Sequence, residues 1–169
     1  MKASRPTTES LRRSRLAWLD SLDEREFAKW FADSLRDPDH GGALGEDPYE
    51  EILWVHHHAM SRELVTRLES NASRLLEAHL RDEGEPIDAA EIFHLGIVIS
   101  RLQLNSLAPR LRRLTEQPRI TTLRYPAPDG RTHVCEQLLY HLASLRYVDD
   151  AFWERHIKNP QFSGPAISR

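Results

Sequence analysis

The densest run of apolar side chains in the sequence is AAEIFHLGIVISRLQL, residues 89–104. These side chains cannot share one helical stripe, so a helix here is apolar on nearly every side and must be surrounded by other elements. Charged Glu91 and Arg101 interrupt a stretch already shorter than the ~20 apolar residues of a membrane span. The pattern predicts a buried central helix. Asp88 and Glu91 have the spacing of a capping box and are expected to begin it, with Glu91 facing the helix end.

Helical spacing also governs the N-terminal part of the chain. A first helix is expected to begin at Thr7 or Thr8. Ser21 and Glu24 then have the S-x-x-E spacing of a capping box, which predicts the start of a second helix. The apolar face of that helix follows the i, i+3, i+4, i+8 pattern and consists of Phe27, Trp30, Phe31 and Leu35.

Two more helices are predicted before the central one. Asp47 has the side chain of an N-cap, followed by a proline in the first turn, and the helix it begins carries the triplet His56-His57-His58. A regular leucine stripe over residues 64–80 predicts the next helix. Gly84 and Pro86 are expected to end it, because glycine terminates helices and proline blocks their continuation.

The periodicity changes once after the central helix. Pro109 fits the first turn of another helix, but residues 119–134 alternate with a period of two around a turn rich in proline and glycine. This alternation predicts a small β-hairpin or an extended loop of similar reach. Helix is expected to resume at about Cys135, and a last helix is expected to begin at Asp149 or Asp150.

Together these elements predict an all-α, or nearly all-α, fold. Helix pairs joined by short turns pack either as an irregular helical bundle or as a short α-solenoid. We expect a single helical domain over residues 8–158, between a disordered tail at 1–7 and a flexible C-terminal tail at 159–169.

Two stretches resemble HEAT-type helical repeats. One is His94-Leu95-Gly96 with the downstream Pro109, and the other is His141-Leu142-Ala143, about one repeat period (~40–47 residues) later. The resemblance covers roughly half of the chain and implies stacked helix pairs that present a surface to another protein. The predicted hairpin between the two stretches departs from the family's pattern, and residues 47–82 lack the matching small residue and proline.

Composition narrows the class of protein. The fractions of hydrophobic (40%) and charged (29%) residues are those of a globular chain, and the net charge of −3 argues against a generally basic nucleic-acid binder. The only cysteine is Cys135, which rules out an intrachain disulfide and a multi-cysteine zinc cluster. The N-terminus has no apolar signal segment, so we expect a cytoplasmic protein with no membrane partner. The many arginines, leucines and alanines are typical of a bacterial source.

The sequence offers weak metal ligands and no catalytic motif. Consecutive helical residues point about 100° apart, so the histidine triplet cannot bind one ion by itself, and its weak candidate is His57. Glu91-x-x-His94 has the spacing of di-iron bundles, which require a second copy that the chain lacks. Cys135, near His133 and His141, is expected to be a core residue. We therefore expect no catalytic residue, no metal and no cofactor.

The strongest binding candidate is an arginine-rich segment, residues 110–131, with few acidic neighbours in sequence. Its arginine side chains could bind phosphates or an acidic protein surface. They are Arg110, Arg112, Arg113, Arg119, Arg124 and Arg131. The alternative is a solvated helix face whose arginines pair with acids from other helices.

These observations favour a non-enzymatic helical protein–protein interaction module, an accessory or adaptor subunit of a bacterial cytoplasmic assembly. A protein is the expected partner, and self-association into a homo-oligomer is an open alternative. The second hypothesis is a helical subunit that binds nucleic acid through the arginine-rich segment. The third is a metal-binding helical-bundle enzyme.

Overall fold

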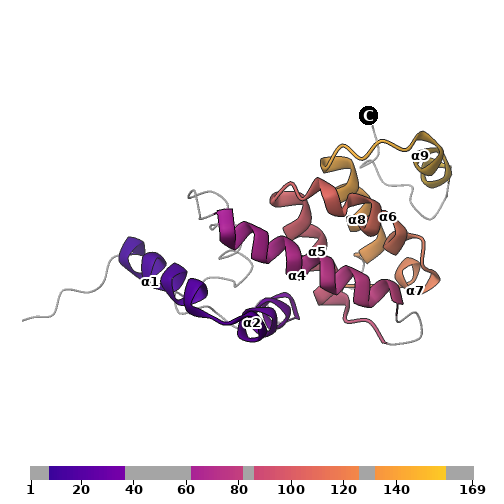
Figure 1. The fold of residues 1–169 in the computed structure, drawn as a ribbon. Helices are drawn as coiled ribbons and strands as arrows, with labels where there is room; N and C mark the ends of the chain where they lie inside the picture. Colours follow the sequence, from indigo (N-terminus) through magenta and orange to yellow (C-terminus); the bar gives the residue numbers. More distant parts are fainter. Residues whose placement is uncertain (1–7, 37–61, 82–85, 126–131, 159–169) are drawn as a thin grey trace, which may run out of the picture. The chain divides into compact units, whose positions relative to one another are not determined.

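The computed structural model describes residues 8–36, 62–81, 86–125 and 132–158, and these segments are mostly helical (Figure 1). They confirm the predicted all-α fold and form no strand, only one β-bridge between Arg124 and His133. The predicted helix after Asp47, with the histidine triplet, lies outside the described residues. The elements are α1 Thr8–Ser21, α2 Glu24–Arg36, α4 Arg62–Arg81, α5 Ala89–Arg101, the 3-10 helix η1 Asn105–Leu107, α6 Ala108–Thr115, α7 Pro118–Thr121, α8 Val134–Ser144 and α9 Asp150–Ile157.

The chain divides into two compact units, Met1–Asn71 and Ala72–Arg169, with the boundary inside α4. This division does not test the predicted single domain over residues 8–158. The predicted tails, 1–7 and 159–169, lie outside the described residues. The apolar core residues of the first unit are Leu19, Phe27, Phe31, Leu35, Leu64 and Leu68. Of the predicted face of α2, only Trp30 is outside this core, because it is half-buried.

The cap of α2 lies two residues after the predicted one. The Asp23 carboxylate accepts the backbone N–H of Glu26 (2.8 Å), and the Glu26 carboxylate accepts the backbone N–H of Asp23 (3.1 Å). Ser21 is still helical, because α1 extends to it, and its hydroxyl donates to the Trp18 carbonyl instead. The predicted Ser21–Glu24 box is therefore wrong, although D-x-x-E and S-x-x-E caps work by the same reciprocal bonding.

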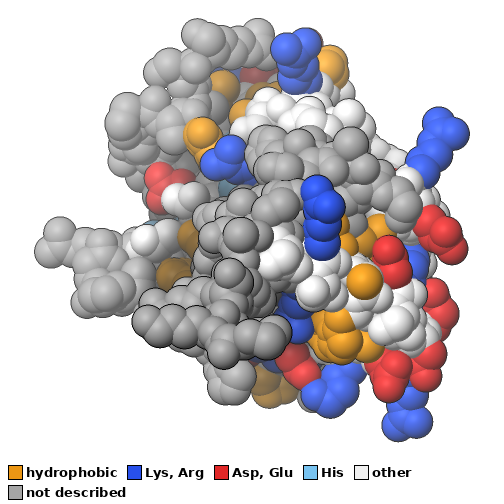
Figure 2. All heavy atoms as spheres, turned by 90° about the vertical axis from the view of Figure 1, so that its left-hand side faces the viewer, with side chains coloured by type: hydrophobic (Ala, Val, Ile, Leu, Met, Phe, Trp, Pro, Cys, Tyr) orange, Lys and Arg blue, Asp and Glu red, His pale blue; other side chains and the backbone are white. Residues whose placement is uncertain are grey.

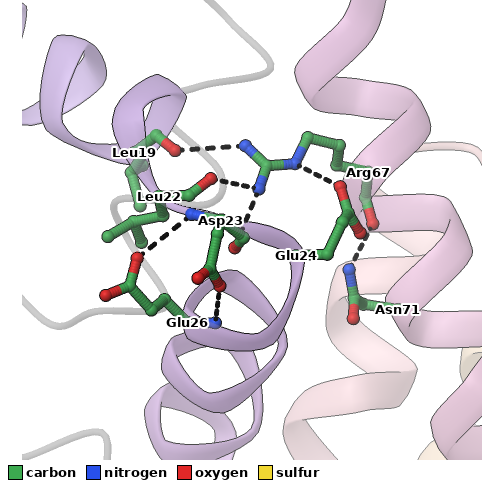
Figure 3. A network of polar contacts seen from close by, with 7 residues as sticks. All are labelled: Leu19, Leu22, Asp23, Glu24, Glu26, Arg67 and Asn71. Atoms are coloured by element: carbon green, nitrogen blue, oxygen red, sulfur yellow. Dashed lines mark hydrogen bonds and ion pairs between the residues drawn. The ribbon is translucent and has the colours of Figure 1, made fainter.

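A single arginine of α4 closes the turn between α1 and α2 (Figure 3). The Arg67 guanidinium donates to the carbonyl oxygens of Leu19 (3.2 Å), Leu22 (2.7 Å) and Asp23 (3.2 Å). Its Nε atom lies 3.2 Å from the Glu24 carboxylate. The Leu22 carbonyl lies just beyond α1, and Arg67 gives it a donor that the helix itself does not supply. The carbonyls of Leu19 and Asp23 also accept from the backbone N–H groups of Leu22 and Phe27.

In the second unit, α5 is the predicted buried central helix, and it packs most extensively against α8 (Figure 1). Gly96 lies where the two helices are closest. A Cβ atom at Gly96 would stand 2.6 Å from Cδ2 of Leu138 and 3.0 Å from Cδ2 of His141. The glycine is therefore required by space between helices rather than by an unusual backbone conformation.

The ends of α5 and α8 have the same geometry. Each helix is followed by a non-glycine residue with positive φ, Gln103 (52°) after α5 and Arg146 (53°) after α8. The next backbone N–H reaches back to the carbonyl of Ile99 in α5 and of Leu142 in α8, which is the Schellman pattern. These ends align Gln103 with Arg146. In this alignment His141 corresponds to Val98. The HEAT-type resemblance instead matches His141 with His94, which lies one helical turn before Val98.

The segment predicted as a hairpin, residues 119–134, begins as a helix. Pro118 starts α7, and Ile120 is buried within it, so the expected strand is wrong over that part. Extended pairing follows: the N–H of Tyr125 donates to the Thr132 carbonyl (3.0 Å), and the N–H of Val134 donates to the Leu123 carbonyl (3.0 Å). The described ends of the segment therefore pair through one antiparallel β-bridge, and the residues between them, 126–131, lie outside the described part of the chain.

Candidate arginine-rich site and its surroundings

The arginines of α6 diverge toward acids on other helices. Arg110 Nη2 lies 3.1 Å from Oε1 of Glu77 on α4. Arg112 Nη2 lies 3.0 Å from Oε1 of Glu116 and 4.0 Å from Oδ2 of Asp149, which caps α9. These two arginines therefore connect α6 to its neighbours, as the alternative interpretation of the segment expects.

The remaining arginines of the segment have three different settings. Arg119 donates to the backbone carbonyl of His79 at the end of α4, and its Nε donates to Oε1 of Gln117 (3.0 Å). Arg124 is exposed in the extended loop, and Arg131 lies outside the described residues. Arg113 is exposed, and no hydrogen bond or ion pair within the described part of the chain involves its side chain.

Charges of opposite sign are mixed rather than segregated. Figure 2 shows one face on which basic and acidic side chains of the described residues are interspersed. A field of one sign, which steers nucleic acids and acidic proteins over long distances, requires the opposite arrangement. The described side chains drawn in Figure 2 thus show no broad basic patch.

Arg113 lines a depression of about 240 Å³. Its position is the corner where the end of α4 meets α6 and α7. The residues that line it are Leu80, Arg113, Glu116, Gln117 and Pro118. The Glu116 carboxylate is held by Arg112 and, at 3.1 Å, by Arg155 of α9, so its charge is already compensated.

Few large apolar side chains of the described residues are exposed, and most of them lie on the last two helices. Trp18 belongs to α1, whereas Tyr140, Val148 and Ile157 belong to α8, the α8–α9 connection and α9. Their exposed fractions are 54% for Tyr140, 86% for Val148 and 53% for Ile157.

The weak metal candidates do not come together. Glu91 is buried, and its Oε1 lies 2.6 Å from Nε2 of His79, whereas His94 Nε2 lies 3.5 Å from the Tyr125 hydroxyl. Glu91 was expected to face the helix end, and that expectation is wrong because α4 supplies a partner inside the unit. Asp88 does cap α5. His57 lies outside the described residues, within which no three metal-ligating side chains form a group.

Cys135 has the surroundings of a core residue. It is fully buried, and its Sγ lies 3.5 Å from the Thr115 carbonyl. Burial, with a smaller effect of Glu136, raises the pKa of the thiol to about 12. A thiol that stays protonated at neutral pH is a poor nucleophile.

His141 is a buried polar group that the sequence analysis named in the repeat-like motif and near Cys135. Its Nδ1 lies 2.9 Å from the hydroxyl of Ser100, and its Nε2 is buried with no hydrogen-bond partner among the described residues. Burial, and next the charge of Arg101, lowers the pKa of this imidazole to about 4. His141 is therefore neutral at pH 7 and forms part of the α5–α8 interface.

Comparisons with protein-family models, with curated proteins and with solved structures found no match to this chain. The HEAT-type resemblance accordingly rests on this sequence alone. Among the described helices, none combines the length and the apolar character that crossing a bilayer requires.

Proposed function

We propose that this protein is a non-enzymatic helical protein–protein interaction module, an accessory or adaptor subunit of a bacterial cytoplasmic assembly. The observation that carries the proposal is the exposure of Tyr140, Val148 and Ile157 on the C-terminal helix pair, α8 and α9. The matching ends of α5 and α8 further support an array of helix pairs, an architecture that serves as a binding surface.

Exposed apolar side chains favour association when a rigid support holds them. Covering one large apolar side chain contributes roughly 1.5–3 kcal/mol. The support here is α9, which is held to α6 through Arg155 and Glu116 and through Arg112 and Asp149. Its own Phe152 is fully buried. A surface that is already ordered loses little conformational entropy when a partner binds.

The test compares proteins captured by the full chain from cells of its source. Val148→Asp combined with Ile157→Asp places charge on the proposed surface without entering the core, and Thr66→Asp on α4 is a control that also adds charge at an exposed position. The proposal expects a partner that the wild type and Thr66→Asp retain and that the double variant loses, confirmed by titration of purified proteins. Identical capture by all three proteins would refute the proposed surface.

A nucleic-acid-binding function is the second candidate, and the observation in its favour is that Arg113 and Arg124 are both exposed. A gel-shift titration with duplex DNA and single-stranded RNA should then show binding that weakens steeply with salt. Arg113→Glu with Arg124→Glu should abolish it, whereas Arg146→Glu should not. Binding that is absent, or insensitive to salt, would remove this candidate.

A further inference from the structure

The depression at the end of α4 has one polar side chain left open to a ligand. Glu116 is occupied by Arg112 and Arg155. Gln117 accepts from Arg119 through Oε1, and its Nε2 lies 3.5 Å from the His79 carbonyl. The guanidinium of Arg113 is the group whose donors have no acceptor among the described residues.

The walls of the depression restrict the ligand to a small anion next to an apolar group. Leu80 and Pro118 supply apolar surface on either side of the polar residues. Arginine binds a carboxylate through parallel N–H···O bonds, and one guanidinium balances one carboxylate charge. The single positive charge of Arg113 is matched more closely by a carboxylate than by a phosphate dianion.

We propose that the pocket of Arg113, lined by Leu80, Glu116, Gln117 and Pro118, binds a carboxylate of an acidic peptide segment. The Asp or Glu side chain of the segment pairs with Arg113, and a neighbouring apolar side chain packs on Leu80 and Pro118. This inference rests on the proposed function, because it identifies an acidic segment as one part of the protein partner that the module binds. The pocket adjoins the proposed surface through the Glu116–Arg155 ion pair.

The direct test follows the Nε–H resonance of Arg113 by two-dimensional NMR of the full chain at low salt. The resonance is assigned from its absence in Arg113→Gln. The probes are the capped peptide acetyl-Leu-Glu-Leu-Glu-amide and its isosteric control acetyl-Leu-Gln-Leu-Gln-amide. We expect a saturable shift with the glutamate peptide only. Affinity should fall about tenfold or more in Arg113→Gln, because a hydrogen bond to a charged group is lost.

The control variant is Arg146→Gln, which removes the same charge from an exposed arginine that does not line the pocket, and it should bind like the wild type. The inference is overturned if Arg113 does not shift, if both peptides shift it equally, or if Arg113→Gln binds unchanged. A competition with inorganic phosphate gives a further test. The inference is also overturned if phosphate binds the pocket more tightly than the peptide and displaces it, because the pocket would then be assigned to phosphate.

The outcome for the pocket can be separated from the outcome for the proposed function. Peptide binding that persists in Val148→Asp/Ile157→Asp, with no partner captured by any form of the chain, supports the pocket and contradicts the interaction surface. Capture of a partner by the wild type and Arg113→Gln alike, with its loss in the double variant, supports the surface and contradicts the pocket's role in it.

Discussion

The Nε2 atom of His79 lies 2.6 Å from the Oε1 atom of Glu91, and this contact joins the last turn of α4 to the first turn of α5. Glu91 is only 1% exposed, so its carboxyl group would otherwise be buried away from water. Arg119 and Gln117 meet the backbone carbonyl of the same histidine. Both the side chain and the backbone of His79 thus hold the end of α4 against the rest of its unit.

Replacing one partner of this pair should therefore destabilise the fold more than replacing both. His79→Leu removes the imidazole that contacts the buried Glu91 carboxyl group, and we expect a loss of about 3 kcal/mol in the free energy of unfolding. His79→Leu with Glu91→Leu should recover most of that loss. Urea denaturation of the wild type, both single variants and the double variant gives the coupling energy. Additive effects would show that the contact contributes little.

The sequence predicted best those features of the fold that depend on residues close together in the chain. The spacing of Phe27, Phe31 and Leu35 was enough to define the buried face of α2, and the apolar residues of α5 were enough to identify the central helix. Helix ends were less certain, since Ser21 and Asp23 both precede a glutamate at the capping distance. Only the length of α1 decides between them.

Interactions between distant parts of the chain had no sequence signal. Arg67 donates hydrogen bonds to backbone carbonyls at the end of α1. Every residue has a backbone carbonyl, so the sequence does not indicate which carbonyls an arginine will contact. The sequence shows the arginine-rich segment as a concentration of charge, but it does not show that the partners of Arg110 and Arg112 include acids from α4 and the start of α9. The unpaired state of Arg113 emerges only after those partners are known.

His141 should make stability depend on pH in the acidic range. Its pKa is about 4 in the folded chain and near the ordinary 6.5 when unfolded. As the pH falls below 6.5, the unfolded state takes up the proton first, so stability decreases toward pH 4, by about 3 kcal/mol in total. Above pH 6.5 this group contributes no pH dependence.

The measurement for His141 is the free energy of unfolding of the wild type and of His141→Leu between pH 7 and pH 4. Ser100 keeps its bond to the Ile97 carbonyl in the variant, so its hydroxyl retains a partner. The variant should show a shallower decline than the wild type. Parallel curves would mean that His141 is protonated equally well in both states.

Gly96→Ala should destabilise the α5–α8 contact. The new methyl group would meet Leu138 and His141 at distances that real side chains avoid, and such overpacking costs about 1–3 kcal/mol. Leu138→Val, which removes bulk at the nearer contact, should reduce the cost of the alanine when the two changes are combined. Thermal unfolding of the four proteins in this cycle provides the test, and an alanine that stabilises the chain would contradict the close approach.

Arg146→Gly should stabilise the protein, and Gln103→Gly should do so less. Both residues have a positive φ that costs a side-chain-bearing residue about 1 kcal/mol or more, whereas glycine adopts it freely but loses more entropy on folding. The net gain expected for Arg146→Gly is about 0.5–1 kcal/mol, seen as a rise in Tm of roughly 1–4 °C. The Gln103 side chain donates to the Ser100 carbonyl at 2.7 Å, and its removal should offset much of the gain there. Equal effects of the two glycines would indicate that this side-chain bond contributes nothing, and a loss of stability in Arg146→Gly would contradict the assigned helix end.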